Sequence, residues 1–270
     1  MPLPLPSTLS PSKVSSFTNC ALAFRFTNID RLPEPPSLPA VKGTTVHRAL
    51  ELLLDAEPAG RTPDRARECL EQALVEMAED ADYVALALSP GDADAFARDA
   101  AAMVDRYFSL EDPTTVETVG LEMMLTADLG DVTARGIIDR LERDGEGQLV
   151  VTDYKTGRAP SPDQQGARMT GVHFYSMLCE HVLGERPVRV QLVYLGRDPQ
   201  IISVSTSEQS NRGTERKVRA VWSAIERACA TEDFRPRPGA LCRWCSFQAY
   251  CPAFGGDPDQ AAVQLGRGDG

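Results

Sequence analysis

The sequence lacks the long apolar segment of a membrane-spanning helix, because no apolar run approaches the ~18 residues that such a helix needs. The opening residues, Met-Pro-Leu-Pro-Leu-Pro-Ser, also lack the basic start and the apolar stretch of a signal peptide. We therefore expect a cytoplasmic protein. In that reducing compartment its seven cysteines are better interpreted as thiols or metal ligands than as disulfides.

The sequence also lacks the positive charge that is typical of nucleic-acid-binding proteins, since its formal net charge is −11. The acidity is concentrated in residues 55–112, which contain 15 acidic and 5 basic residues. The rest of the chain has 24 acidic and 23 basic residues and is close to neutral. Because DNA responds to the local field at its binding groove, the overall charge does not exclude a DNA partner.

Hydrophobic periodicity predicts helices and strands that together make an α/β fold. The predicted helices begin at Ser10 or Ser12 and then cover residues 43–54, 63–80, 91–108, 165–183 and 208–230. The predicted strands cover residues 115–127, 132–143, 148–155, 188–195 and 200–205. Prolines before residue 43 predict an extended loop, and the residues after 254, rich in Gly and Asp, are expected to be disordered.

Two aspartates lie at strand positions whose neighbours on the same face are apolar. Strand alternation places Asp139 with Ile137 and Leu141, and it places Asp153 on one face with Lys155. A carboxylate among core residues is costly unless a divalent cation compensates it, and strands ~4.8 Å apart let both carboxylates reach one ion. The Lys155 amine could then orient a water or stabilise a charged transition state. A buried Asp–Lys ion pair without a catalytic role is the alternative.

His47 and Glu51 are separated by one helical turn and therefore share a face of the predicted helix 43–54. His47 could supply an imidazole ligand to the same cation. Glu51 could orient that imidazole or the water shell of the cation. A purely structural histidine is the alternative interpretation of this helix.

Four cysteines form a candidate metal or iron–sulfur site. Cys242, Cys245 and Cys251 follow the pattern Cys-x2-Cys-x5-Cys, and Cys20 lies far earlier in the chain. Four thiolates suit zinc and iron–sulfur clusters alike, so the spacing alone does not choose between them. With Cys20 as the fourth ligand, the site would tie the N-terminal helix to the C-terminal segment. The other cysteines fall on apolar helical stripes and are expected in the core: Cys69, Cys179 and Cys229.

In their order along the chain, these motifs resemble the RecB-family exonucleases of the PD-(D/E)xK nuclease superfamily, in the iron–sulfur branch. That branch includes the AddB nuclease domain and the CRISPR-associated RecB-like exonucleases. The resemblance runs from about Ser10 to Phe254. Its anchors are residues 9–12, Cys20, residues 24–26 and 43–47, Gly136-Ile-Ile-Asp139-Arg140, Val151-Thr-Asp153-Tyr-Lys155-Thr-Gly157 and the C-terminal cysteine triplet.

The resemblance implies a restriction-endonuclease-like core, in which helices flank a central mixed sheet, with a helical insertion and a four-cysteine cluster cap. We expect a single nuclease domain over residues 8–254. Its acidic helical insertion would cover about 55–112 and its nuclease core about 113–230. The cap would be formed by residues 10–30 and 234–254, and residues 255–270 would be the disordered tail.

The resemblance also implies the roles of the site residues. His47, Asp139, Asp153 and the Tyr154 carbonyl would hold Mg²⁺ or Mn²⁺, and Lys155 would be catalytic. The four cysteines named above would hold a [4Fe–4S] cluster, with zinc as the alternative cofactor.

One further catalytic residue follows from the resemblance, and it is accompanied by a departure from the family pattern. Tyr175 matches the tyrosine of a Gln-x-x-x-Tyr helix that contacts DNA or the active site. The glutamine position holds Gly171 here. The proline that usually follows the first cysteine is also replaced, by Ala21.

We therefore predict a metal-dependent DNA exonuclease that hydrolyses phosphodiester bonds at single-stranded ends. The resemblance suggests DNA repair, recombination or CRISPR-type DNA processing as its role, with a helicase or CRISPR adaptation partner. One rival is a non-catalytic DNA-binding or scaffold module that serves a helicase, which Gly171 favours. A second rival is a cysteine-ligated redox or zinc protein that does not bind nucleic acid.

Overall fold

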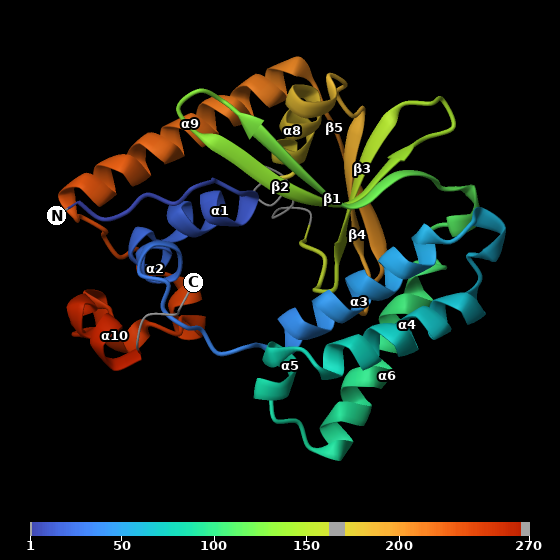
Figure 1. The fold of residues 1–270 in the computed structure, drawn as a ribbon, viewed down its shortest axis with the longest axis horizontal. Coiled ribbons are helices and arrows are strands. Elements are labelled where there is room, and N and C mark those ends of the chain that lie inside the picture. Colours follow the sequence, from blue (N-terminus) through green and yellow to red (C-terminus); the bar gives the residue numbers. More distant parts are fainter. Residues whose placement is uncertain (1, 162–170, 266–270) are drawn as a thin grey trace. The chain divides into compact units, whose positions relative to one another are not determined.

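The computed structural model describes residues 2–161 and 171–265, which form two compact units (Figure 1). The sheet unit consists of Pro36–Leu125 and Ile137–Asn211. The cysteine unit consists of Met1–Pro35, Thr126–Gly136 and Arg212–Gly270. The expected single nuclease domain stays a prediction. Among the described residues, none of the helices has the length and apolar character needed to cross a membrane.

A five-stranded mixed sheet, in the order β1-β2-β3-β4-β5, confirms the predicted α/β class. Strand β2 pairs with β3 antiparallel, β3 with β4 parallel, and β4 with β5 antiparallel. All five strands lie within three residues of their predicted bounds: β1 Glu117–Asp128, β2 Thr133–Arg143, β3 Leu149–Lys155, β4 Arg189–Tyr194 and β5 Gln200–Ser205. The parallel β3–β4 pair requires a crossover, and helix α8 (His173–Leu183) lies within it.

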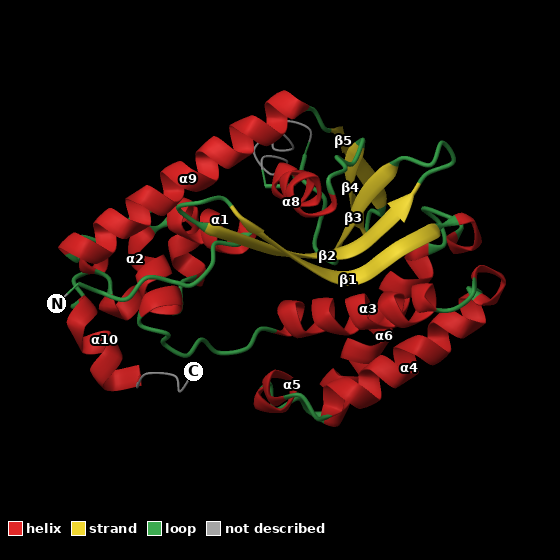
Figure 2. Ribbon diagram, turned by 45° about the horizontal axis from the view of Figure 1, so that its top comes forward, coloured by secondary structure: helices red, strands yellow, loops and turns green. Residues whose placement is uncertain are grey.

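Strand β3 is buried along its length from Leu149 to Tyr154, and only Lys155 at its end is exposed. Such a run is typical of a strand that is covered on both faces. Figure 2 shows helices α3 (Leu38–Asp55), α4 (Pro63–Ala78) and α6 (Pro90–Tyr107) on one face of the sheet and α8 on the other. The site residues on β3 therefore lie in the interior of the sheet unit, near the end of a strand.

The three covering helices share one apolar core with the sheet. The core includes Leu50 and Leu53 of α3, Leu70 of α4, Val104 of α6 and Val193 of β4. Helices α4 and α6, with the short α5 (Ala81–Ala85) between them, occupy the predicted acidic insertion, although the sequence pattern did not indicate α5.

Helix α3 begins earlier than its predicted start at residue 43. The side chain of Ser37 caps the helix by accepting a hydrogen bond from the Ala40 backbone N–H at 3.3 Å. Pro39 is accommodated because the first turn of a helix has no use for its missing N–H. The expected loop is therefore shorter than the prolines suggested.

The cysteine unit begins with α1 (Pro11–Asn19), which Ser10 caps as predicted, followed by α2 (Ala21–Phe24) and a π-helical turn at Arg25–Ile29. Helix α9 (Glu208–Thr231) enters this unit at Arg212. Short 3-10 turns then carry the cysteine triplet: Ala240–Trp244, Gln248–Tyr250 and Pro252–Phe254.

The chain continues into helix α10 (Pro258–Leu265), so the expectation of a disordered tail does not hold for these residues. Its Asp and Pro residues suit the start of a helix. Asp257 accepts a hydrogen bond from the Asp259 backbone N–H at 3.1 Å, and Ala261 is fully buried. The Asp and Pro residues whose abundance suggested disorder here form the start of a helix.

Candidate active site

Three side chains of the sheet unit converge where a cation could bind. His47 of α3, Glu122 of β1 and Asp139 of β2 each offer a ligand atom, and these atoms lie within 4.8 Å of one another. The Nδ1 atom of His47 is 3.5 Å from Oδ2 of Asp139. An imidazole with two carboxylates is a donor set that fits Mg²⁺ or Mn²⁺.

The main chain of Tyr154 joins this group. Its N–H donates a hydrogen bond to Oδ2 of Asp139 at 2.7 Å, and its carbonyl oxygen is 3.1 Å from Nε2 of His47. That spacing suits a hydrogen bond. It also suits two adjacent ligands of one octahedral cation, because bonds of ~2.1 Å place such ligands ~3 Å apart. His47, Asp139 and Tyr154 thus lie together.

Asp153 and Lys155 form an ion pair beside the group. Asp153 is 5% exposed, and its Oδ2 is 2.5 Å from Nζ of Lys155. Burial favours the neutral amine, but the charge and hydrogen bond of Asp153, together with the charge of Asp139, outweigh burial and raise the pKa of Lys155, which is therefore a cation at neutral pH. The converging ligand atoms belong to His47, Glu122 and Asp139, whereas Asp153 is paired with Lys155.

The register of the strands explains why the two aspartates are neighbours. Arg140 of β2 pairs with Thr152 of β3, so the next residues along the strands, Asp139 and Asp153, face each other. Ile137 is 48% exposed, against the expectation that it belongs to the core. Asp139 therefore lies where this face of β2 passes from solvent to core.

The carboxylates of the site carry more negative charge than the residues around them compensate. Burial, followed by the charge of Asp153, raises the pKa of Asp139 to about 6. Partial desolvation, followed by the charge of Asp139, raises the pKa of Glu122 to about 7. A divalent cation would relieve both effects, so these residues fit the metal that their donor atoms suggest.

Glu122 is the residue that the sequence interpretation missed. It lies within β1 with a φ of 43°, in the left-handed region that a non-glycine residue seldom adopts. Strained backbone of this kind gathers at functional sites. The only sequence signal was an acidic residue among the apolar residues of a predicted strand.

The remaining predicted catalytic residues, Tyr175 and Glu51, lie near the group. Burial, followed by the charges of Asp153 and Asp139, raises the pKa of the Tyr175 phenol on α8. The charge of Glu51 contributes to the raised pKa of Glu122, while its own carboxylate accepts a hydrogen bond from Arg48 at 2.9 Å.

Four cysteines are predicted to share a cofactor: Cys20, Cys242, Cys245 and Cys251. All four line one cavity of the cysteine unit, and Phe26 and Phe247 are among the other residues that line it. Burial raises the pKa of the Cys245 thiol, and the charges of the other three thiols add to that rise. Backbone N–H groups approach two of the sulfurs, at 3.5 Å for Cys20 and 3.3 Å for Cys242.

Comparison with known proteins identifies the family to which this chain is similar. Residues 8–252 match the family model described as the PD-(D/E)XK nuclease superfamily. The Gene 69 protein of Mycobacterium phage D29 is 23% identical in an alignment of 273 positions. The alignment covers 93% of this chain and 98% of the phage protein.

Solved structures are similar in fold. A candidate exonuclease of Eubacterium rectale superposes with a TM-score of 0.57 at 12% identity, covering 88% of this chain and 87% of its own. The structure of SSO0001 aligns over 93% of this chain and 88% of its own chain at 13% identity, with a TM-score of 0.44.

Proposed function

Because the chain belongs to the PD-(D/E)XK nuclease superfamily, we propose that it is a metal-dependent exonuclease that hydrolyses DNA phosphodiester bonds at single-stranded ends. One observation carries this proposal. His47, Glu122, Asp139 and the Tyr154 carbonyl converge beside the ion pair of Asp153 and Lys155.

The proposed cation ligands are His47, Glu122, Asp139 and the Tyr154 carbonyl. Asp153 completes the set, because its carboxylate has a second oxygen besides the one that pairs with Lys155. These residues would hold a divalent cation, which would supply positive charge to lower the pKa of a water and to offset the charge of the phosphate.

The chain's own residues supply the other roles of the reaction. Lys155 is a cation at the end of β3 and stabilises the negative charge that develops on the phosphate oxygens. Tyr175 and Glu51 border the carboxylates, where they orient substrate and water. Gly171 lacks the amide side chain of the family's helix motif, so Tyr175 makes the helix's substrate contact without it.

A preference for single strands is supported by the cysteine unit. The predicted cap, residues 10–30 and 234–254, contains five basic residues and one acidic residue, in a chain whose net charge is −11. Trp244 is 76% exposed, and the guanidinium of Arg243 lies 5.4 Å from its ring centroid. Exposed aromatic rings beside arginines stack on the bases of single strands, whereas bases in a duplex are already stacked.

For the cysteine unit we propose a [4Fe–4S] cluster ligated by Cys20, Cys242, Cys245 and Cys251, which would place the chain in the iron–sulfur branch of the RecB family. A cavity bordered by four thiols supports a polynuclear centre, and zinc is the alternative. The cluster's role would be structural, because its ligands come from both ends of the cysteine unit.

The biological setting follows from the same family resemblance. We propose a cytoplasmic enzyme of DNA repair, recombination or CRISPR-type DNA processing. A helicase or a CRISPR adaptation complex would deliver the DNA ends. Co-purification with either assembly, measured with the active enzyme, would identify the partner.

The proposal is tested by digestion of end-labelled single- and double-stranded DNA with Mn²⁺, Mg²⁺ or EDTA. We expect cleavage that needs the cation, and a loss of at least about 1000-fold in Asp153→Ala with DNA binding retained. Asp94→Asn, at an exposed position of α6, serves as the matched control and should keep full activity.

Gly171 favours a second candidate function, a DNA-binding module that does not cleave. Binding without cleavage by protein that contains its cofactor would establish that function instead. Failure to bind any DNA at low salt would point to a cysteine-ligated redox or zinc protein.

A further inference from the structure

Arg140 follows Asp139 in β2, so its side chain points to the opposite face of the sheet. It is fully buried, at 0% exposure. A guanidinium at such a position must be matched by opposite charges and hydrogen bonds, because the isolated ion would be very costly to bury. Its partners therefore show what the arginine holds together.

Two carboxylates form ion pairs with Arg140. Glu111, which follows α6, forms a bidentate pair with both terminal nitrogens, one of them at 2.9 Å, and Glu142 pairs with Nε. The exposed fractions of these glutamate side chains are 15% and 9%. The arginine thus connects β2 with the segment after α6.

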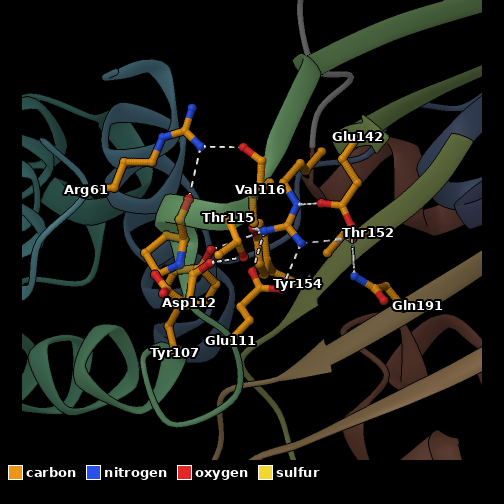
Figure 3. Close-up of polar contacts among 12 residues, drawn as sticks. Arg61, Tyr107, Glu111, Asp112, Thr115, Val116, Glu142, Thr152, Tyr154 and Gln191 are labelled. Atoms are coloured by element: carbon orange, nitrogen blue, oxygen red, sulfur yellow. Dashed lines mark hydrogen bonds and ion pairs between the residues drawn. The ribbon is translucent and has the colours of Figure 1, made fainter. Parts of the chain in front are cut away.

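Three hydroxyl oxygens lie within hydrogen-bonding distance of the terminal nitrogens of Arg140, and two of them share Nη1 with Glu111. They belong to Tyr107 at 3.1 Å, Tyr154 at 2.8 Å and Thr152 at 3.2 Å. Gln191 of β4 extends the network by donating to the Thr152 hydroxyl at 2.7 Å. Figure 3 draws these contacts, with partners that come from α6, β3 and β4.

Tyr154 belongs both to this network and to the proposed cation site. Its hydroxyl accepts from Arg140, whereas its main chain contacts Asp139 through the N–H and His47 through the carbonyl. A side chain fixed at its far end restricts the rotation of the peptide groups at its near end. Tyr154 therefore links a contact on one face of the sheet to the proposed cation site on the other.

We propose that Arg140 is a positioning residue, which holds the Tyr154 main chain where it can serve as a ligand of the cation. The inference rests on the proposed function, since it concerns the same site. Partners that orient the ligands of a metal typically change its affinity about 10- to 100-fold when they are lost.

Two tyrosines provide a matched test. Tyr154→Phe and Tyr107→Phe each remove one hydroxyl acceptor from the same nitrogen of Arg140 and keep the aromatic ring. Only Tyr154 has a main chain that contacts the site. Calorimetric titration with Mn²⁺ should show about tenfold weaker binding in Tyr154→Phe and unchanged binding in Tyr107→Phe, with similar losses in thermal stability.

Equal Mn²⁺ affinities in wild type, Tyr154→Phe and Tyr107→Phe would overturn the inference and leave the cation site intact. Equal weakening in both variants would also overturn it, because a general loosening of the core would then explain the effect. A wild-type protein that binds no Mn²⁺ would instead refute the proposed site, and with it the inference.

Discussion

The two faces of the β2–β3 pair contain the same kinds of group in opposite states. On one face, which we call the matched face, the buried Arg140 pairs with two carboxylates and has three hydroxyls around it. On the other, Asp139 and Glu122 have raised pKa values beside Asp153. Matched charge is what a structural network needs, and unmatched charge marks a place where a ligand completes the protein.

The largest effect on stability is expected when the matched face is broken. Arg140→Met leaves Glu111 and Glu142 with no cation among the network's side chains, and we expect unfolding to become about 3–5 kcal/mol easier. Urea denaturation at neutral pH measures this loss. If the free energy of unfolding fell by less than about 1 kcal/mol, the network would be solvated and would not stabilise the sheet.

A smaller change in stability is expected on the unmatched face. There, the substitution Asp139→Asn should raise stability at neutral pH and not lower it. The pKa of Asp139 rises from an ordinary value of 3.8 to about 6 in the folded protein, so the folded state binds this proton more tightly than the unfolded chain. The resulting stabilisation is complete below the unfolded pKa and is lost as the pH rises through about 6. Asp139→Asn removes this dependence.

Urea denaturation in EDTA between pH 4 and 8 tests the sign. From the lower to the upper end of that range, wild type should lose on the order of 2 kcal/mol relative to Asp139→Asn. Comparing the two proteins cancels the carboxylates that lie away from the site. The pKa of Glu122 should fall in Asp139→Asn, because the charge of Asp139 contributes to its rise, and this change has the same sign. If the free energy of unfolding of wild type instead rose relative to Asp139→Asn with rising pH, the claim that the Asp139 carboxylate is uncompensated would be contradicted.

The smallest effect is expected in the cysteine unit. Trp244→Ala should weaken the binding of single-stranded DNA about tenfold, whereas Trp244→Phe should retain most of the affinity, because stacking needs a ring. Fluorescence quenching measures the contact directly in a Trp222→Phe background, since the chain has two tryptophans and Trp222 is 7% exposed. Asp153→Ala in EDTA prevents cleavage during the titration. Equal affinities for Trp244→Ala and wild type would contradict the stacking surface.

Some of this site could be predicted from the sequence because it depends on local periodicity. Alternation along two strands places Asp139, Asp153 and Lys155 on compatible faces, and the hydrophobic stripe of α3 places His47 toward the sheet. These positions follow from the period of one element at a time.

Other parts depend on which elements become neighbours, and periodicity does not contain that information. Glu122 reaches the site because β1 lies next to β2 and because its backbone adopts a positive φ. Glu111 reaches Arg140 from the segment after α6. The resemblance of the motifs marked Arg140 as part of a pattern, but only the contacts explain what the arginine does.

The central claim is that the unmatched carboxylates bind a divalent cation, and calorimetric titration of Mn²⁺ into wild type and Asp139→Asn at neutral pH tests it most directly. The account predicts binding at one site in wild type and none, or binding at least about 100-fold weaker, in the variant. Equal binding by both proteins would show that the cation binds elsewhere and would contradict the account.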